Sequence, residues 1–173
     1  MISSKLLLSL LTAISGYTGY AIPGDPPHVE TLPHLVLEQR VCGRPCQVYA
    51  FTFPDGEIVI DEALAIGTDP VATSILVHEL THFLQMKSAA HLDRVTCRIW
   101  NDREREAFEV QTRWLRDISQ HSCLFRRNEA SQLARLAYSL SRSLRHCAAT
   151  ILDQRMRHLD LIGSGMAQTR SLE

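Results

Sequence analysis

The segment ILVHELTHFLQ, residues 75–85, decides the expected fold because it sets reactive polar side chains into an otherwise apolar helix. Residues four apart lie on the same face of an α-helix, so His78 and His82 can direct one imidazole nitrogen each to the same point. Glu79 follows His78 directly and can reach a water bound there. Two imidazoles at this spacing suit a zinc ion, which takes nitrogen and carboxylate ligands and keeps one position open in hydrolytic sites. The structural alternative is a pair of half-buried histidines that are satisfied by hydrogen bonds.

The helix that carries these residues has recognisable ends. Asp69 is suited to cap its N-terminus, and Pro70 stands at the first helical position, where its missing N–H costs nothing. We expect this helix to run from about Pro70 to Lys87. Its length and apolar composition predict a largely buried helix.

A third ligand is expected on the next helical segment, predicted over residues 101–120. It offers three carboxylates, of which helical phase places Glu104 beside the apolar stripe, whereas Glu106 and Glu109 point further towards solvent. We therefore choose Glu104 as the third ligand and keep Glu106 as the alternative. Glu104 also has a purely structural explanation, because Asn101 followed three residues later by Glu is a capping box.

The pattern His78-Glu79-x-x-His82, followed by Glu104 in a Glu-x-x-Ala107 context, resembles the gluzincin branch of the zincin metallopeptidases and is similar to small exported bacterial proteins of that kind. The resemblance implies a Zn²⁺ cofactor held by His78, His82 and Glu104. It also implies that Glu79 is the general base in the hydrolysis of a peptide bond.

The resemblance covers roughly residues 45–118 and departs from two related patterns. No Gly-x-x-His follows His82 at the distance that the metzincin branch requires. Phe108 stands where an Asp four residues after Glu104 often supports the ligand helix. This departure concerns the groups that hold the ligands rather than the ligands themselves.

Strand patterns precede the motif helix. Residues 47–53 and 57–61 alternate in polarity and are rich in β-formers, and Pro-Asp-Gly at residues 54–56 marks a turn between them. We expect a hairpin or two short sheet strands. In zincins an edge strand pairs with an extended substrate, and we assign that role to the strand around residues 57–60.

The overall expectation is an α+β, zincin-like minimal domain over residues 22–162. A short β-sheet or hairpin is followed by the active-site helix and by two or three further helices, the last of them over residues 128–161. The tail over residues 163–173 is small and polar, so we expect it to be disordered.

The first residues read as an export signal. Lys5 supplies a positive charge, residues 6–14 form a short apolar run, and Gly-Tyr-Ala at residues 19–21 fits a cleavage site. The run is shorter than the about 20 residues that a membrane-spanning helix needs. We therefore predict a signal peptide over residues 1–21 and an exported, periplasmic or secreted, protein with no membrane attachment after cleavage.

The chain has five cysteines, at positions 42, 46, 97, 123 and 147. In an oxidising compartment some of them should pair. Cys42 and Cys46 can close a small local loop, and Cys97 with Cys123 can form a longer bridge. The odd count leaves at least one thiol unpaired within the chain.

Charge and motif together define the expected partners and the competing functions. The net charge of −1 gives no sign of nucleic acid or an anionic membrane as partner, so we expect a peptide or protein substrate. Oxyanion stabilisation, which zincin enzymes draw from a Tyr or His, has four candidates that the sequence does not separate: His91, His121, Tyr138 and His146. One alternative is a zincin-fold module that binds zinc without turnover, and another is a helical export protein with a chance motif.

Overall fold

The computed structural model describes residues 2–88 and 96–121 of the chain, which divides into two compact units. The first unit comprises residues 1–95 and 102–127. It contains all the helices and strands described below, apart from the first residues of the last helix. The second comprises residues 96–101 and 128–173, and its described part is the start of that helix. The helix predicted over residues 128–161 and the tail lie outside the described residues.

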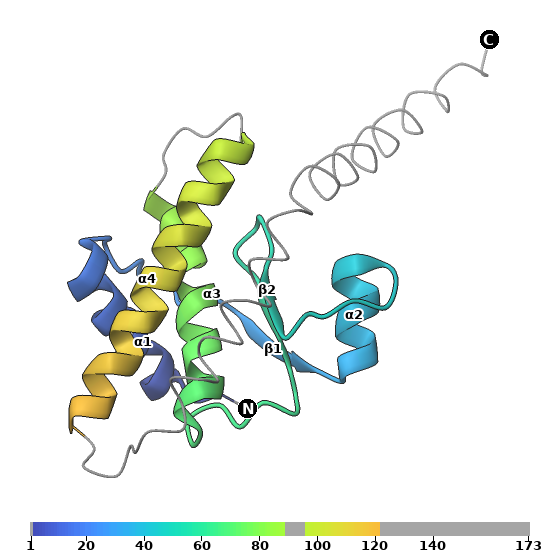
Figure 1. Cartoon of the computed structure of the whole chain (residues 1–173), viewed down its shortest axis with the longest axis horizontal. Coiled ribbons are helices and arrows are strands. Elements are labelled where there is room, and N and C mark those ends of the chain that lie inside the picture. Colours follow the sequence, from blue (N-terminus) through green and yellow to red (C-terminus); the bar gives the residue numbers. More distant parts are fainter. Residues whose placement is uncertain (1, 89–95, 122–173) are drawn as a thin grey trace. The chain divides into compact units, whose positions relative to one another are not determined.

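The described residues form an α+β fold, as predicted (Figure 1). In chain order the elements are α1 (Ser4–Thr18), β1 (Val29–Leu32), α2 (His34–Cys42), β2 (Ala50–Thr52), β3 (Ile58–Asp61), α3 (Pro70–Ser88) and α4 (Cys97–His121).

The three strands form one mixed sheet in the order β1-β3-β2. β3 pairs in parallel with β1 and antiparallel with β2, so the predicted hairpin is confirmed. Its turn is closed by a hydrogen bond of 2.8 Å from Phe53 N to Glu57 O, and Gly56 has a φ of 96°, which glycine adopts without strain. Because β3 is the central strand, the expectation that it pairs with a substrate is wrong. The edge strands are β1 and β2.

The two faces of β3 pack against different helices. Ile58 and Ile60 are fully buried in a core with α1 and α3, whereas Val59 is fully buried on the other face with Leu37 of α2. This division follows from the alternation of side chains along a strand. The sheet therefore separates α2 from the layer that carries the motif helix.

α3 is the buried helix that the sequence predicts. Asp69 Oδ1 accepts a hydrogen bond of 2.9 Å from Val71 N, as expected of a cap. Polar side chains inside the helix are satisfied locally: Thr81, which is fully buried, donates to Val77 O at 2.8 Å. Such bonds let α3 expose little surface despite its hydroxyl-bearing residues.

α4 begins earlier than predicted, at Cys97 rather than near residue 101. Thr96 Oγ1 accepts a hydrogen bond from Ile99 N at 3.3 Å, so the alternative in which Asn101 caps the helix is wrong. The predicted apolar stripe is confirmed by the burial of Ala107, Val110 and Leu115. α4 packs on α3, where the buried Gln111 donates to Ser74 Oγ at 2.9 Å.

α1 occupies the segment predicted to be a signal peptide. It buries Leu7, Leu10, Leu11 and Ile14 in the core that also holds α3 and β3. No described helix has the length and apolar character needed to cross a membrane. Cleavage after residue 21 stays a prediction.

α2 and β1 were not anticipated, since residues 22–34 were expected to form an extended lead-in. α2 ends in the predicted disulfide between Cys42 and Cys46. Disulfides persist in oxidising compartments, and this one is consistent with export. Cys97 carries a free, exposed thiol in the described part of the chain. Its suggested partner Cys123 lies outside the described residues, as does Cys147.

Candidate metal centre

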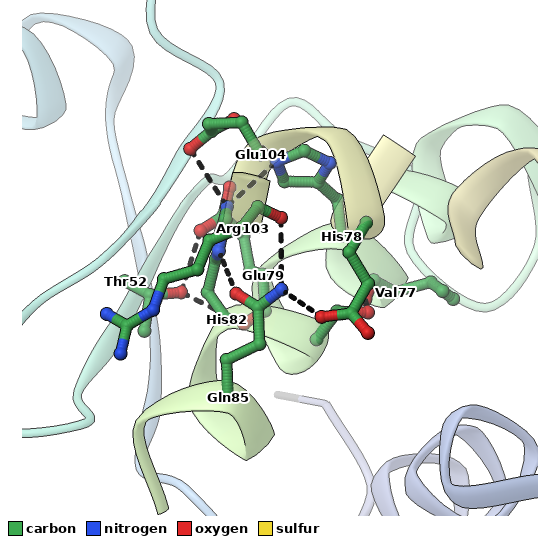
Figure 2. A network of polar contacts seen from close by, with 10 residues as sticks. Thr52, Val77, His78, Glu79, His82, Gln85, Arg103 and Glu104 are labelled. Atoms are coloured by element: carbon green, nitrogen blue, oxygen red, sulfur yellow. Dashed lines mark hydrogen bonds and ion pairs between the residues drawn. The ribbon is translucent and has the colours of Figure 1, made fainter. Parts of the chain in front are cut away.

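Three side chains converge where α3 faces α4 (Figure 2). The Nε2 atoms of His78 and His82 lie 3.1 Å apart. Glu104 Oε1 lies 3.1 Å from Nε2 of His82, and Glu104 Oε2 lies 3.4 Å from Nε2 of His78. The side chains are 10%, 16% and 17% exposed for His78, His82 and Glu104, in that order. Within the described residues this is the group whose ligand atoms can hold a metal ion.

Gln85 determines which nitrogen of His82 faces this point. Its Nε2 donates to Arg103 O at 3.0 Å and to Glu106 Oε2 at 2.8 Å, both of which only accept. The amide oxygen must therefore face His82, whose Nδ1 lies 2.9 Å from it. A carbonyl oxygen accepts only, so Nδ1 carries a hydrogen, and Nε2, which faces His78 and Glu104, is the nitrogen whose lone pair becomes available when the ring is neutral. This is the tautomer that a metal ion requires.

His78 is held differently. Its Nδ1 is the one buried side-chain polar atom, among the residues that the structure describes, that has no hydrogen-bond partner there. The ring of Phe108 lies against the imidazole, with centroids 4.4 Å apart. In the described residues, packing against Phe108 takes the place of a hydrogen bond to Nδ1 in orienting this ring.

The charges of the site are coupled. Burial alone would lower the pKa of His82, but Glu104 above all, with Glu79 and Gln85, raises it to about 9. Burial alone would raise the pKa of Glu104, but its hydrogen bonds and opposite charge with both histidines lower it to about 2. The metal-free site thus favours one extra positive charge, here a proton, which a cation at the same point can replace.

Glu79 is buried and directed towards the sheet. Thr52, the last residue of β2, has its Oγ1 2.7 Å from Glu79 Oε2 and 3.1 Å from Glu79 O. A hydroxyl has one hydrogen, and the shorter bond to the carboxylate is the stronger of the two. The carboxylate next to the candidate metal centre is thereby tied to an edge strand (Figure 2).

Glu106, the alternative third ligand, has another position. Its Oε2 accepts from Gln85 and also from the hydroxyl of Tyr20, at 2.7 Å. The expectation that Glu106 points further towards solvent is wrong because α1 and Tyr20, which follows the cap of α1, cover this side of α4. Burial and the bond to Glu106 raise the pKa of Tyr20 to about 12, so Tyr20 remains a donor at neutral pH. Glu104 is the carboxylate that reaches both histidines.

Three functional candidates were not found from the sequence. Gln85 lies three residues after His82, and helical spacing alone could have indicated their contact. Thr52 and Tyr20 reach the site from distant segments, and no local pattern points to them. Of the oxyanion candidates, His91, Tyr138 and His146 lie outside the described residues, as does the side chain of His121.

Comparisons with protein-family models, with curated proteins and with solved structures found no match to this chain. Any functional conclusion therefore rests on the site and on the resemblance of its motif.

Proposed function

We propose that this protein is a zinc-dependent hydrolase of the gluzincin type that cleaves peptide bonds. His78, His82 and Glu104 are the ligands of Zn²⁺, and Glu79 is the general base. The observation that carries the proposal is the convergence of both Nε2 atoms, 3.1 Å apart, with the carboxylate of Glu104 at one point. Two imidazoles and one carboxylate are a ligand set of catalytic zinc sites, which leave one position open.

Zinc in such a site supplies a Lewis acid that polarises a carbonyl group and lowers the pKa of water. The residues of this chain do the rest. Glu79 accepts a proton from the attacking water and delivers it to the leaving amine. Its bond to Thr52 holds one carboxylate oxygen and limits the positions that the side chain can occupy.

An extended peptide is the substrate class that we assign. β2 is an edge strand of the described sheet, and its Thr52 contacts Glu79 directly. A peptide that pairs with the free edge of β2 would bring its backbone near the general base. We further propose that the protein works in an oxidising compartment, which the Cys42–Cys46 disulfide supports.

The alternative is a zinc-binding module without turnover. One observation favours it, because the Thr52 hydroxyl occupies one carboxylate oxygen of Glu79 and draws that side chain towards the sheet. Against it stands the chemistry of Glu79 itself, since a structural zinc site needs no carboxylate at this position.

Metal analysis and a set of Glu→Gln variants test the proposal. We expect about one zinc ion per purified full-length chain, and we expect Glu104→Gln to lose far more zinc affinity than Glu106→Gln. Glu109→Gln is the matched control, because Glu109 is exposed on the same helix. Zinc-free wild-type protein that also fails to bind added zinc would overturn the metal site.

Turnover is tested with Glu79→Gln on a peptide library. We expect this variant to keep its zinc and to lose activity by at least about 100-fold, within the range for a general base. Equal cleavage by wild type and variant would reject the catalytic role. Zinc binding without any cleavage by the wild type would favour the alternative module.

A further inference from the structure

Tyr20 connects the N-terminal segment to the candidate metal centre. It follows Gly19, the left-handed cap of α1. Its backbone is held on both sides: Ser15 Oγ donates to Tyr20 O at 2.7 Å, and Thr18 Oγ1 accepts from Tyr20 N at 3.2 Å. The end of α1 therefore fixes where the tyrosine side chain begins.

A continuous series of hydrogen bonds runs from this tyrosine to a metal-ligand candidate. The Tyr20 hydroxyl and the Gln85 amide both donate to the same oxygen of Glu106, at 2.7 and 2.8 Å. The other end of the Gln85 amide accepts from His82 Nδ1 at 2.9 Å. Each bond has one possible direction, because the carboxylate and the carbonyl only accept. Glu106, together with the carbonyl oxygen of Arg103, thus holds the orientation of Gln85, and through it the ring of His82.

We propose that Tyr20 is a positioning residue of the metal centre, and that residues 1–21 are consequently part of the working protein. This proposal depends on the proposed function only in that the site must bind a metal ion. It does not depend on whether the site cleaves a substrate. It explains why a half-buried carboxylate on α4 contacts a residue 86 positions earlier in the chain. The burial of four apolar residues of α1 in the core of α3 supports the same conclusion.

The chain contains a matched control for this tyrosine. Tyr17, in the last turn of α1, donates to Asp117 of α4 at 2.7 Å. The two tyrosines share a donor group, a carboxylate acceptor on the same helix and the same bond length. They differ in that the bond of Tyr20 continues through Gln85 to His82. Removal of either hydroxyl should lower the stability of the fold by a similar amount. Only removal of the Tyr20 hydroxyl should weaken metal binding.

The test compares Tyr20→Phe with Tyr17→Phe in the full-length protein. Zn²⁺ affinity is measured by competition with a chelator, and the d–d spectrum of bound Co²⁺ is recorded. Supporting groups around metal ligands contribute about 10–100-fold in affinity, and we expect about tenfold for Tyr20→Phe with a changed spectrum. We expect Tyr17→Phe to keep wild-type affinity and spectrum. Equal effects of the two variants, or none for Tyr20→Phe, would overturn the proposal.

A double substitution tests the route. In a Gln85→Leu background Tyr20 has no amide to act through, so adding Tyr20→Phe should produce no further loss of zinc affinity. Additive losses would overturn the proposed path. If the wild type binds no metal at all, the proposed function fails together with this inference; if it binds zinc and Tyr20→Phe binds equally well, only the inference fails.

A measurement of the intact mass shows whether residues 1–21 remain on the purified protein. We expect zinc-loaded protein to retain residues 1–21 when it is purified from an expression host whose export machinery is intact. A zinc-loaded chain that begins at residue 22 and has full-length affinity would overturn the proposal.

Discussion

The side-chain oxygen of Gln85 lies 2.9 Å from Nδ1 of His82, one helical turn earlier on α3. Because the Gln85 amide is held by two acceptors on α4, this contact keeps a hydrogen on Nδ1 and leaves Nε2 as the nitrogen that gives up its proton to a metal ion. α4 thus contributes both a ligand candidate, Glu104, and the acceptors that orient a ligand on the facing helix.

Gln85→Leu should weaken zinc binding. The leucine fills a similar volume but leaves His82 Nδ1 without an acceptor, and we expect a loss of about 10–100-fold in affinity. Gln111→Leu is the control, because this buried glutamine also joins the two helices, through Ser74, and among the described residues no hydrogen bond links it to either histidine. Chelator competition measures both. An equal loss in the two variants would mean that helix packing, and not the His82 contact, supports the site.

Thr52→Val should reduce turnover and leave zinc binding intact. The variant removes the hydroxyl that holds Glu79, whereas the ligand groups keep their contacts. We expect kcat/KM to fall by about tenfold, since the general base loses its positioning bond. Thr31→Val, at an exposed residue of the other edge strand, should have no effect. A loss of zinc from Thr52→Val would show that β2 supports the ligands instead.

The stability of the zinc-free protein should depend on the ion pair between His82 and Glu104. The pKa of His82 is raised from 6.5 to about 9, so its contribution is complete below 6.5 and is lost as the pH rises through 9. The pKa of Glu104 is lowered from 4.5 to about 2, so its contribution is complete above 4.5 and is lost as the pH falls through 2. The pair therefore stabilises most between pH 4.5 and 6.5.

Thermal unfolding in the presence of a chelator measures this dependence. We expect the Tm of the wild type to decrease between pH 6.5 and 9, and that of Glu104→Gln to decrease less over the same range. Parallel curves for the two proteins would exclude the ion pair as the source.

Substitutions of Leu11 and Leu8 test whether α1 packs in the core. Leu11 is 1% exposed and Leu8 is 59% exposed. We expect Leu11→Ala to lower the free energy of unfolding by about 2–5 kcal/mol. Leu8→Ala should change it by less than about 0.5 kcal/mol. Denaturant unfolding of the full-length variants gives both values, and equally small effects would mean that α1 does not pack as described.

Much of the site could be predicted from the sequence because it depends on local periodicity. The spacing of His78 and His82 places them on one face of any helix that contains them, and the capping and apolar pattern predict that helix. Helical phase also favours Glu104 over Glu106, and Glu104 is the one that lies within 3.4 Å of both histidines.

Reasoning from local sequence patterns was wrong where contacts between distant elements determine the structure. Glu106 was expected to face solvent because nothing in α4 indicates that α1 covers it. α2 was missed because its helical pattern is weak: Leu35 and Val36 are exposed on it, and Leu37 is its one buried apolar residue. β1 is a short strand next to prolines and gains its structure by pairing with β3.

The sequence by itself determined the motif helix, the hairpin and the identity of the metal-ligand candidates, since each depends on residues close together in the chain. Only the tertiary structure decided which strand is the edge, which groups hold Glu79 and His82, and that the N-terminal segment reaches the site. Those features depend on contacts between elements far apart in sequence, whose geometry is set by how the core packs and not by any local period.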